Sequence, residues 1–135
     1  MKRHWIEYQQ ERPDCPMTFW VHREVDGKPW FEADEFDPPR QAACPGLGYP
    51  VYKVECDGFI FEFASLSELC ECIETLGTKL LPRTLDLSRA RGTTMGPNSH
   101  WLSKLPARVK SWKYREKAVA YLRVALQEFQ ESTVY

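Results

Sequence analysis

The chain has 135 residues and a mass of 15.8 kDa, which is enough for one domain to bury a hydrophobic core without metals or disulfides. Its composition, 43% hydrophobic and 27% charged, is typical of globular proteins and excludes a wholly disordered chain. No apolar run approaches the roughly 20 residues that span a bilayer, and Glu7 interrupts the basic N-terminus before a signal peptide can form. We therefore expect one cytoplasmic domain over residues 1–135, with no membrane contact.

The net charge of −1 conceals an uneven distribution of charge along the chain. Residues 1–76 hold seven Lys/Arg and fifteen Asp/Glu, whereas residues 77–135 hold eleven Lys/Arg and four Asp/Glu. Such asymmetry between the two halves of a chain is typical of proteins that bind a polyanion. The alternative is that the two halves attract each other within one fold, and the sequence leaves both explanations open.

Alternation of apolar and polar residues predicts strands in the N-terminal half. Residues 3–9, 17–25 and 30–36 follow this pattern, and Asp26-Gly27 predicts a turn between the last two segments. In the predicted register His22 faces away from the apolar side chains of its strand, which favours a position at the surface or in a second layer over a role as a catalytic base.

The clearest local signal is the dipeptide Asp57-Gly58 between two alternating runs, V-Y-K-V-E-C and F-I-F-E-F. A two-residue hairpin turn needs a positive φ at both positions, which Asp-Gly supplies. The register counted outward from the turn has three apolar pairs on one face: Cys56–Phe59, Val54–Phe61 and Tyr52–Phe63. Lys53 and Glu62 pair on the other face, so both faces agree with this register. The preceding residues 37–50 hold four prolines and two glycines and predict a loop.

Two helices are predicted after the hairpin. Ser65-Leu66-Ser67-Glu68 is a capping box that opens a helix over residues 66–76, and Gly77 ends it. Residues 78–99 are predicted to be irregular, and a long helix runs from about residue 106 to 131. The order of elements predicts an α+β fold, in which an antiparallel sheet of about four to five strands (residues 3–64) packs against both helices.

The last helix combines an apolar stripe with a basic face. Trp112, Val119 and Leu126 recur every seven residues, and Leu122 and Phe129 do the same, which predicts a core stripe. On this stripe Trp112 is expected to be a buried anchor rather than a platform for stacking bases. Five cations in the first half of the helix lie at the positive end of its dipole, so a partner should offset their repulsion. The internal candidates are carboxylates of the N-terminal half, and the external candidate is phosphate.

Basic side chains interleaved with aromatic rings suit neutralisation of a nucleic-acid backbone and stacking on single-stranded bases. No RNP, KH, zinc-finger or clear helix-turn-helix pattern accompanies them. We therefore predict a non-enzymatic binding protein whose C-terminal face contacts an anionic macromolecule, either nucleic acid or a nucleoprotein complex. The residues predicted to form this face are Arg89, Arg91, His100, Trp101, Arg108, Lys110, Lys113, Arg115 and Lys117.

The alternative is a module for protein–protein interaction. The predicted strands carry three tryptophans, Trp5, Trp20 and Trp30, and one face of a sheet does not easily bury all of them. An acidic and aromatic face would then remain exposed for a protein partner. Trp20 and Trp30 are the candidate contacts of that face. Small size and divided charge would suit an inhibitor or accessory factor, carried by a phage or mobile element, that acts on a host complex.

Catalysis and metal binding have weaker support in the sequence. It contains no G-x-S-x-G, P-loop or G-x-G-x-x-G context, and His100, the best single candidate, is more readily explained as a helix cap. Cys70 and Cys72 point in different directions on a helix and cannot clamp one ion, with Cys70 expected in the core. A metal or redox role for Cys15 and Cys44 is left open. We expect no cofactor, no metal and no small-molecule substrate.

Overall fold

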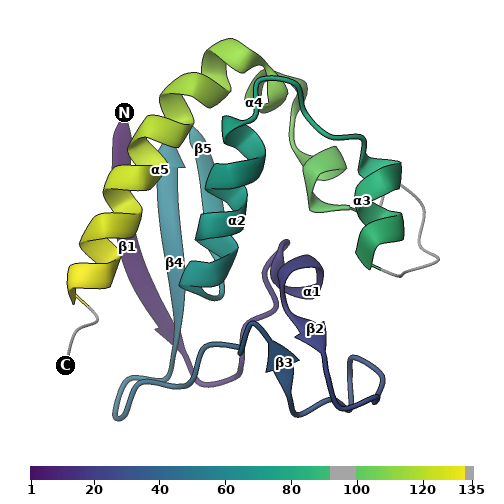
Figure 1. Ribbon diagram of the computed structural model, residues 1–135. Helices are drawn as coiled ribbons and strands as arrows, with labels where there is room; N and C mark the ends of the chain where they lie inside the picture. Colours follow the sequence, from purple (N-terminus) through teal and green to yellow (C-terminus); the bar gives the residue numbers. More distant parts are fainter. Residues whose placement is uncertain (92–99, 133–135) are drawn as a thin grey trace.

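An antiparallel three-stranded sheet forms the centre of an α+β fold (Figure 1). The computed structural model describes residues 1–91 and 100–132, without the side chains of residues 85, 88 and 89. The strands lie in the order β1 (Lys2–Gln9), β4 (Tyr49–Cys56), β5 (Phe59–Phe63). A second sheet pairs β2 (Arg23–Glu24) with β3 (Phe36–Asp37). The predicted fold class is confirmed, although its strands form two sheets rather than one.

The predicted hairpin between β4 and β5 is confirmed in its turn and in its register. Asp57 and Gly58 have φ values of 49° and 89°, the positive values that the turn requires. All four predicted pairs are present: Cys56–Phe59, Val54–Phe61, Tyr52–Phe63 and Lys53–Glu62. Strand β1 adds to the free side of β4 in antiparallel register, from Lys2 opposite Cys56 to Gln9 opposite Tyr49.

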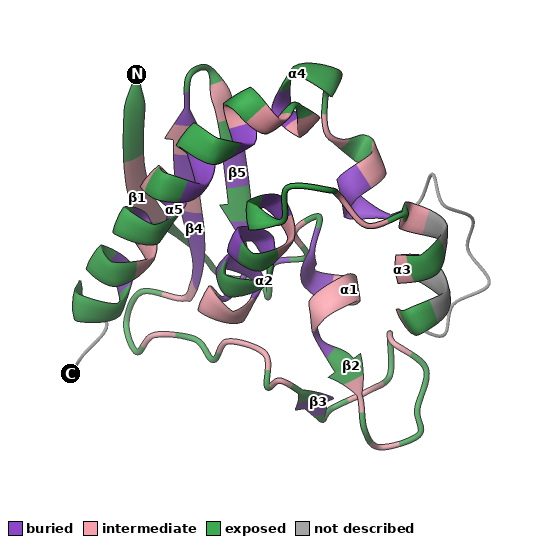
Figure 2. Cartoon of the chain, turned by 45° about the horizontal axis from the view of Figure 1, so that its top comes forward, coloured by how far each residue is buried: buried purple, intermediate pink, exposed green. Residues whose placement is uncertain are grey.

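Helices α2 (Leu66–Gly77) and α5 (Trp112–Ser132) cover one face of this sheet (Figure 1). Their apolar stripes and alternate residues of the strands form the buried core between the two layers (Figure 2). The side chains at its centre include Tyr52, Val54, Phe63, Leu69, Leu76, Leu122 and Phe129. The other face of the sheet, which we call the open face, carries Arg3, Trp5, Glu7, Lys53, Glu55 and Glu62. 

The strands predicted over residues 17–25 and 30–36 are wrong for most of their length. The first segment contains a short helix, α1 (Thr18–Val21), and only the two-residue strands β2 and β3 are paired. The His22 N–H donates to the Thr18 carbonyl at 3.0 Å, which closes the helical turn. Both side chains are fully buried, whereas His22 was expected at the surface or in a second layer. Burial against α2 has overridden the alternating pattern.

The helix predicted over residues 106–131 is interrupted at Ser111. A short helix, α4 (Ala107–Lys110), precedes it, and Ser111 itself is extended with ψ 144°. The Ser111 hydroxyl oxygen accepts a hydrogen bond from the Tyr114 N–H at 3.3 Å, so this serine caps the start of α5. The break turns α4 away from the axis of α5 (Figure 1).

The core stripe of α5 agrees with the predicted one at Val119, Leu122 and Phe129 and differs in its first turn. Its buried residues are Arg115, Ala118, Val119, Leu122, Ala125 and Phe129. Trp112 is only half-buried, with the Arg115 guanidinium 5.1 Å from its ring centroid. The expectation that Trp112 anchors the core is therefore wrong.

The described residues between α2 and α4 include the 3-10 helix η2 (Trp101–Lys104) and helix α3 (Thr84–Arg91). Helix α3 lies within residues 78–99, the stretch that was predicted to be irregular. Residues 92–99 of that stretch are outside the described residues. Among the helices of the described ranges, none is both long enough and apolar enough to cross a bilayer.

Gly48 is expected to tolerate no side chain. Its φ of +105° disfavours L residues, and a Cβ there would lie 2.5 Å from the Gln9 carbonyl oxygen. Gly48→Ala should lower the free energy of unfolding by about 3 kcal/mol or more. Gly46, with φ +81° and nothing within 4 Å of an added Cβ, is the control, and Gly46→Ala should cost only about 1 kcal/mol. Urea unfolding measures both, and equal losses would contradict the clash.

Candidate functional site

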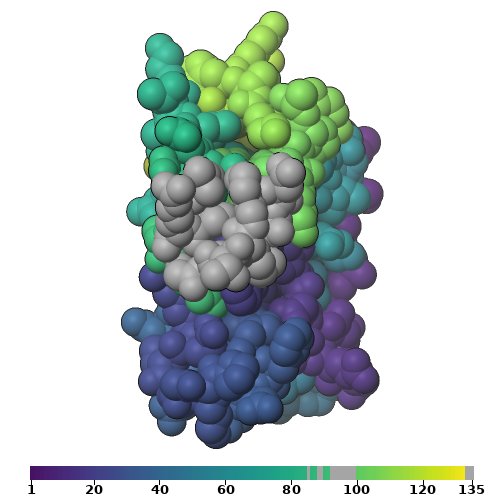
Figure 3. All heavy atoms as spheres, turned by 90° about the vertical axis from the view of Figure 1, so that its right-hand side faces the viewer, coloured from purple at the N-terminus to yellow at the C-terminus, as the bar shows by residue number. Residues whose placement is uncertain are grey.

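Four of the nine residues predicted to bind an anionic partner gather where α4 meets α5. Arg108 and Lys110 lie on α4, and Lys113 and Lys117 lie one turn apart at the start of α5. We call these four residues the basic end. Three of them are exposed and Lys110 is half-buried. In Figure 3 the light-green segment that contains them lies at the top of the molecule, above the dark-blue part of the N-terminal half.

Local packing explains why these cations point outward. Val109, between Arg108 and Lys110, is fully buried and fixes α4 on the core. The Tyr114 hydroxyl donates to the Cys56 carbonyl at 2.8 Å and ties the first turn of α5 to the end of β4. With these apolar and aromatic side chains facing the core, the basic side chains of both helices are left on the solvent side.

The four cations of the basic end are not held in ion pairs with the described carboxylates. None of its four side chains forms an ion pair within 4.0 Å in the part of the chain that the structure describes. The first turn of α5 holds no acidic residue, so the partial positive charge of the helix N-terminus adds to that of the side chains. The internal neutralisation considered from the sequence is therefore not observed for these four cations.

The tip of the β4–β5 hairpin lies beside the basic end. Arg108 donates to the Asp57 carbonyl oxygen at 3.4 Å, and Lys2 lies 3.7 Å from the Asp57 carboxylate. A hydrogen bond from the N-terminal amine, with the charges of Lys2 and Lys117, holds the pKa of Asp57 below its ordinary value. Lys2 thus extends the basic surface, and the Asp57 carboxylate lies beside it.

Arg115, also predicted to bind the partner, is instead buried inside the fold. Its guanidinium donates to the carbonyl oxygens of Leu76 at 3.1 Å, Thr78 at 2.6 Å, Lys79 at 3.0 Å and Lys110 at 2.8 Å. These bonds satisfy carbonyls at the C-terminal end of α2 that have no partner within the helix. Desolvation lowers the pKa of Arg115. The side chain joins α2 to α5, and its exposed fraction of 4% leaves it inaccessible to a macromolecular ligand.

His100 and Trp101 are likewise buried, with exposed fractions of 4% and 5%. His100 Nδ1 accepts a hydrogen bond from the Leu102 N–H at 3.0 Å and so caps η2. This agrees with the interpretation of His100 as a helix-capping or loop residue. The Trp20 ring packs 4.5 Å from the His100 ring, and Trp101 lies in the core. Neither residue is placed to contact a macromolecule.

Arg91 is committed to the N-terminal half of the chain. Its guanidinium pairs with Glu24 at 2.5 Å and donates to the Phe19 carbonyl at 2.8 Å. At this ion pair a cation of the C-terminal half neutralises a carboxylate of the N-terminal half, as expected if the two halves attract each other within one fold. Arg89 lies on α3, and its side chain is outside the described residues.

The two candidates for a protein-binding face, Trp20 and Trp30, do not lie on strands. Trp20 is on α1 and half-buried against His100, while Trp30 packs between Phe19 and Phe36 at centroid distances of 5.3 and 5.0 Å. They belong to a small aromatic cluster around α1 and β3, and not to an exposed face of the main sheet.

A buried polar network around Glu68 was not predicted as a unit. The Glu68 carboxylate accepts hydrogen bonds from the Ala64 N–H and the Thr18 hydroxyl, both at 3.1 Å, and from the Ser65 hydroxyl at 3.2 Å. His22 Nε2 lies 2.8 Å from Ser65 Oγ and 3.3 Å from the carboxylate. Only the capping box gave a sequence signal, because Ser65 and Glu68 are close in the chain.

This serine, histidine and carboxylate are arranged for structure and not for nucleophilic attack. His22 Nδ1 donates to the Pro38 carbonyl at 2.7 Å, and the exposed fraction of Ser65 is 3%. The Ser65 oxygen also accepts from the Glu68 N–H as the helix cap. The recess beside His22 has no room for a water molecule, so no carbonyl substrate reaches the hydroxyl in this conformation.

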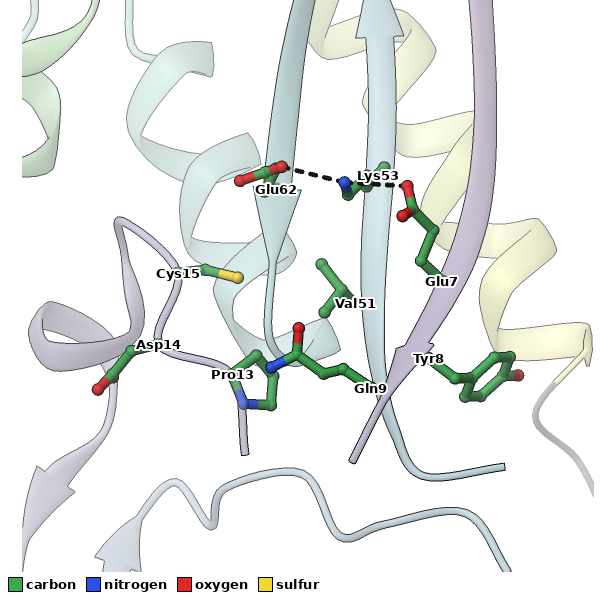
Figure 4. Close-up of a pocket in the computed structure, with 9 residues that line it drawn as sticks. All are labelled: Glu7, Tyr8, Gln9, Pro13, Asp14, Cys15, Val51, Lys53 and Glu62. Carbon is green, nitrogen blue, oxygen red and sulfur yellow. Dashed lines mark ion pairs between the residues drawn. The ribbon is translucent and has the colours of Figure 1, made fainter. Parts of the chain in front are cut away.

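A cleft of about 390 Å³ lies on the open face, between the sheet and residues 13–15 (Figure 4). Lys53 lines one end of it, with its ammonium 2.9 Å from Glu7 and 3.2 Å from Glu62. The hydrogen bond to Glu7 is the main reason that the pKa of Lys53 is raised. Burial raises the pKa of the Cys15 thiol, which faces the cleft, to about 12. Neither group is activated as a nucleophile near neutral pH.

The cysteines form no site that the structure reveals. All five are free thiols, and Cys72 is fully buried whereas Cys70 is exposed, the reverse of the expectation. Within residues 1–91 and 100–132, no group of three or more His, Cys, Asp and Glu side chains is placed to hold a metal ion. Cys15 and Cys44 therefore have no described third ligand.

Comparison with known proteins adds no relative: no protein-family model, curated protein or solved structure matches the chain.

Arg115 is expected to stabilise the fold and to contribute nothing to binding. Arg115→Ala leaves the carbonyls at the end of α2 without donors and should lower the free energy of unfolding by roughly 2–4 kcal/mol. Arg115→Lys keeps the charge but not the fork of donors, and should recover only part of that loss. Urea unfolding measures both variants. A loss below 0.5 kcal/mol for alanine would contradict the structural role.

His100 should make stability depend on acidic pH. Burial lowers the pKa of His100 to about 4 from an ordinary value of 6.5, so the unfolded chain binds the proton more tightly. Its contribution is fully present above pH 6.5 and is lost as pH falls towards 4, by up to about 3 kcal/mol. His100→Asn keeps an acceptor for the Leu102 N–H without the titration. Unfolding measured at pH 7 and 4.5 should show a smaller loss for this variant than for the unsubstituted protein.

Proposed function

We propose that the chain is a non-enzymatic protein that binds the phosphate backbone of nucleic acid through the basic end. The observation that carries the proposal is the cluster of Arg108, Lys110, Lys113 and Lys117 without ion partners among the described residues. Unpaired cations held on two helix ends release counterions when they meet phosphates, and that release drives association. The five free cysteines support a reducing, cytoplasmic setting for this binding.

The same geometry favours recognition of the backbone over recognition of bases. Trp101, expected to stack on bases, lies in the core, and Trp112 is half-buried under Arg115. The Tyr114 hydroxyl is bonded to the main chain. Phosphate contacts position a protein but carry no sequence information, so we expect affinity to depend weakly on base sequence and steeply on salt.

Reversing the three lysines of the basic end should abolish binding without unfolding the protein. Lys110→Glu, Lys113→Glu and Lys117→Glu, combined in one variant, replace three phosphate contacts by repulsion. Fluorescence anisotropy with labelled duplex DNA, single-stranded DNA and RNA, titrated from 50 to 200 mM salt, measures the affinity. A single reversal should reduce the slope of log K against log salt by about 1.

A matched control carries the same change of net charge elsewhere. Arg12→Glu, Arg23→Glu and Lys28→Glu reverse three exposed cations of the N-terminal half, and this variant should keep most of the affinity. Circular dichroism of both triple variants tests folding. Equal losses of binding would show that net charge alone governs the affinity. No binding by the unsubstituted protein at low salt would overturn the proposal and redirect the search to a protein partner.

A further inference from the structure

Strand β1 forms an edge of the three-stranded sheet in the part of the chain that the structure describes. The order β1–β4–β5 pairs one side of β1 with β4 and leaves its other side outermost. The strand is eight residues long, and only its central residues His4, Trp5 and Ile6 are shielded to an intermediate degree. A long edge strand presents main-chain donors and acceptors in the geometry that another strand needs.

The hydrogen-bond pattern identifies which residues face outward. The Asp57 N–H donates to the Met1 carbonyl at 2.8 Å, so the main chain of Met1 points towards the hairpin. Alternation along an antiparallel strand then turns Arg3, Trp5 and Glu7 towards β4. The main-chain groups of His4 and Ile6 consequently point to the open edge.

We propose that β1 pairs antiparallel with β1 of a second copy of this chain, about a two-fold axis at Trp5. In this register the main-chain N–H and C=O groups of His4 in one copy form hydrogen bonds with those of Ile6 in the other copy, and the same pair recurs on the other side of the axis. The main-chain groups that point to the open edge of each strand are thereby paired. Trp5 faces its own symmetry mate in a non-hydrogen-bonded pair, where side chains approach most closely. The two sheets become one continuous six-stranded sheet.

Charge complementarity selects the second copy as the occupant. The two-fold register sets Arg3 of each copy opposite Glu7 of the other, on the open face. Arg3 already pairs with Glu55, and Glu7 with Lys53, which in turn pairs with Glu62. The dimer joins these pairs into a row of alternating sign across five strands: Glu62, Lys53 and Glu7 of one copy, then Arg3 and Glu55 of the other.

The helical layer offers an apolar side chain on the same side. On α5, Tyr121 bonds His4 at 2.6 Å and Glu128 pairs with the same histidine, so this stripe of the helix lies over β1. Val124 falls between them on the stripe and is 48% exposed. The two-fold axis places the two α5 helices on the same face of the joined sheet, where Val124 of each copy gains cover.

A charge swap tests the register directly. Sedimentation equilibrium at about 1 to 500 μM should show a monomer–dimer equilibrium for the unsubstituted protein. Arg3→Glu or Glu7→Arg alone places like charges opposite each other twice and should weaken the dimer about tenfold or more. The double variant, and an equimolar mixture of the two single variants, should restore it. Positions 3 and 7 of one strand are about 13 Å apart, so a rescue cannot arise within one copy.

Disulfide trapping gives an independent measurement. A Cys at position 5 brings two symmetry-related Cα atoms to about 4.5 Å, within the range for a disulfide, so Trp5→Cys should form a covalent dimer on mild oxidation. The trapping uses a Cys70→Ser background, because Cys70 is an exposed free thiol. In that background, Ile60→Cys, 44% exposed on the opposite edge strand, and the protein without a further substitution should form no covalent dimer. A monomer at every concentration overturns the proposal. So does a dimer that ignores the charge swap and is not trapped at position 5.

Discussion

The buried carboxylate of Glu68 is the interaction on which the arrangement of the N-terminal half depends. It receives hydrogen bonds from α1, from Ala64, which follows β5, and from the cap of α2, while His22 connects the same carboxylate to the Pro38 carbonyl. A buried carboxylate is tolerated only when its oxygens are satisfied, so these segments hold one another in place. The polar centre explains why α1 is a helix despite its alternating sequence.

Arg115 is a second buried charge, and it differs from the neighbouring cations of α4 and α5, which are left at the surface. It ties the end of α2 to α5 and thereby fixes the direction in which α4 leaves the core. The cations on either side of it in the sequence are left on the surface, without carboxylate partners among the described residues. One buried guanidinium thus holds in place the two helices that carry the exposed charges.

Sequence reasoning succeeded where a signal and its partner are near in the chain. Asp57-Gly58 and the capping box of Ser65 and Glu68 are local devices, and both were predicted. The helix at Thr18–Val21 was missed because its cause, Glu68, lies about fifty residues away. For the same reason the sequence did not distinguish buried Arg115 from exposed Lys113. Both are cations of one helix, and the carbonyls that bind Arg115 lie at the end of α2, far away in the chain.

The order of elements along the chain has a consequence for biosynthesis. Strands β4 and β5 and helix α2 are consecutive in residues 49–77, so their contacts are local and form early. Helix α5, which covers the same sheet face, is made some forty residues later. During translation the apolar face of the nascent sheet, with Tyr52 and Phe63, is therefore covered by α2 alone until α5 has been synthesised. Exposed apolar surface of this kind makes a nascent chain prone to aggregation.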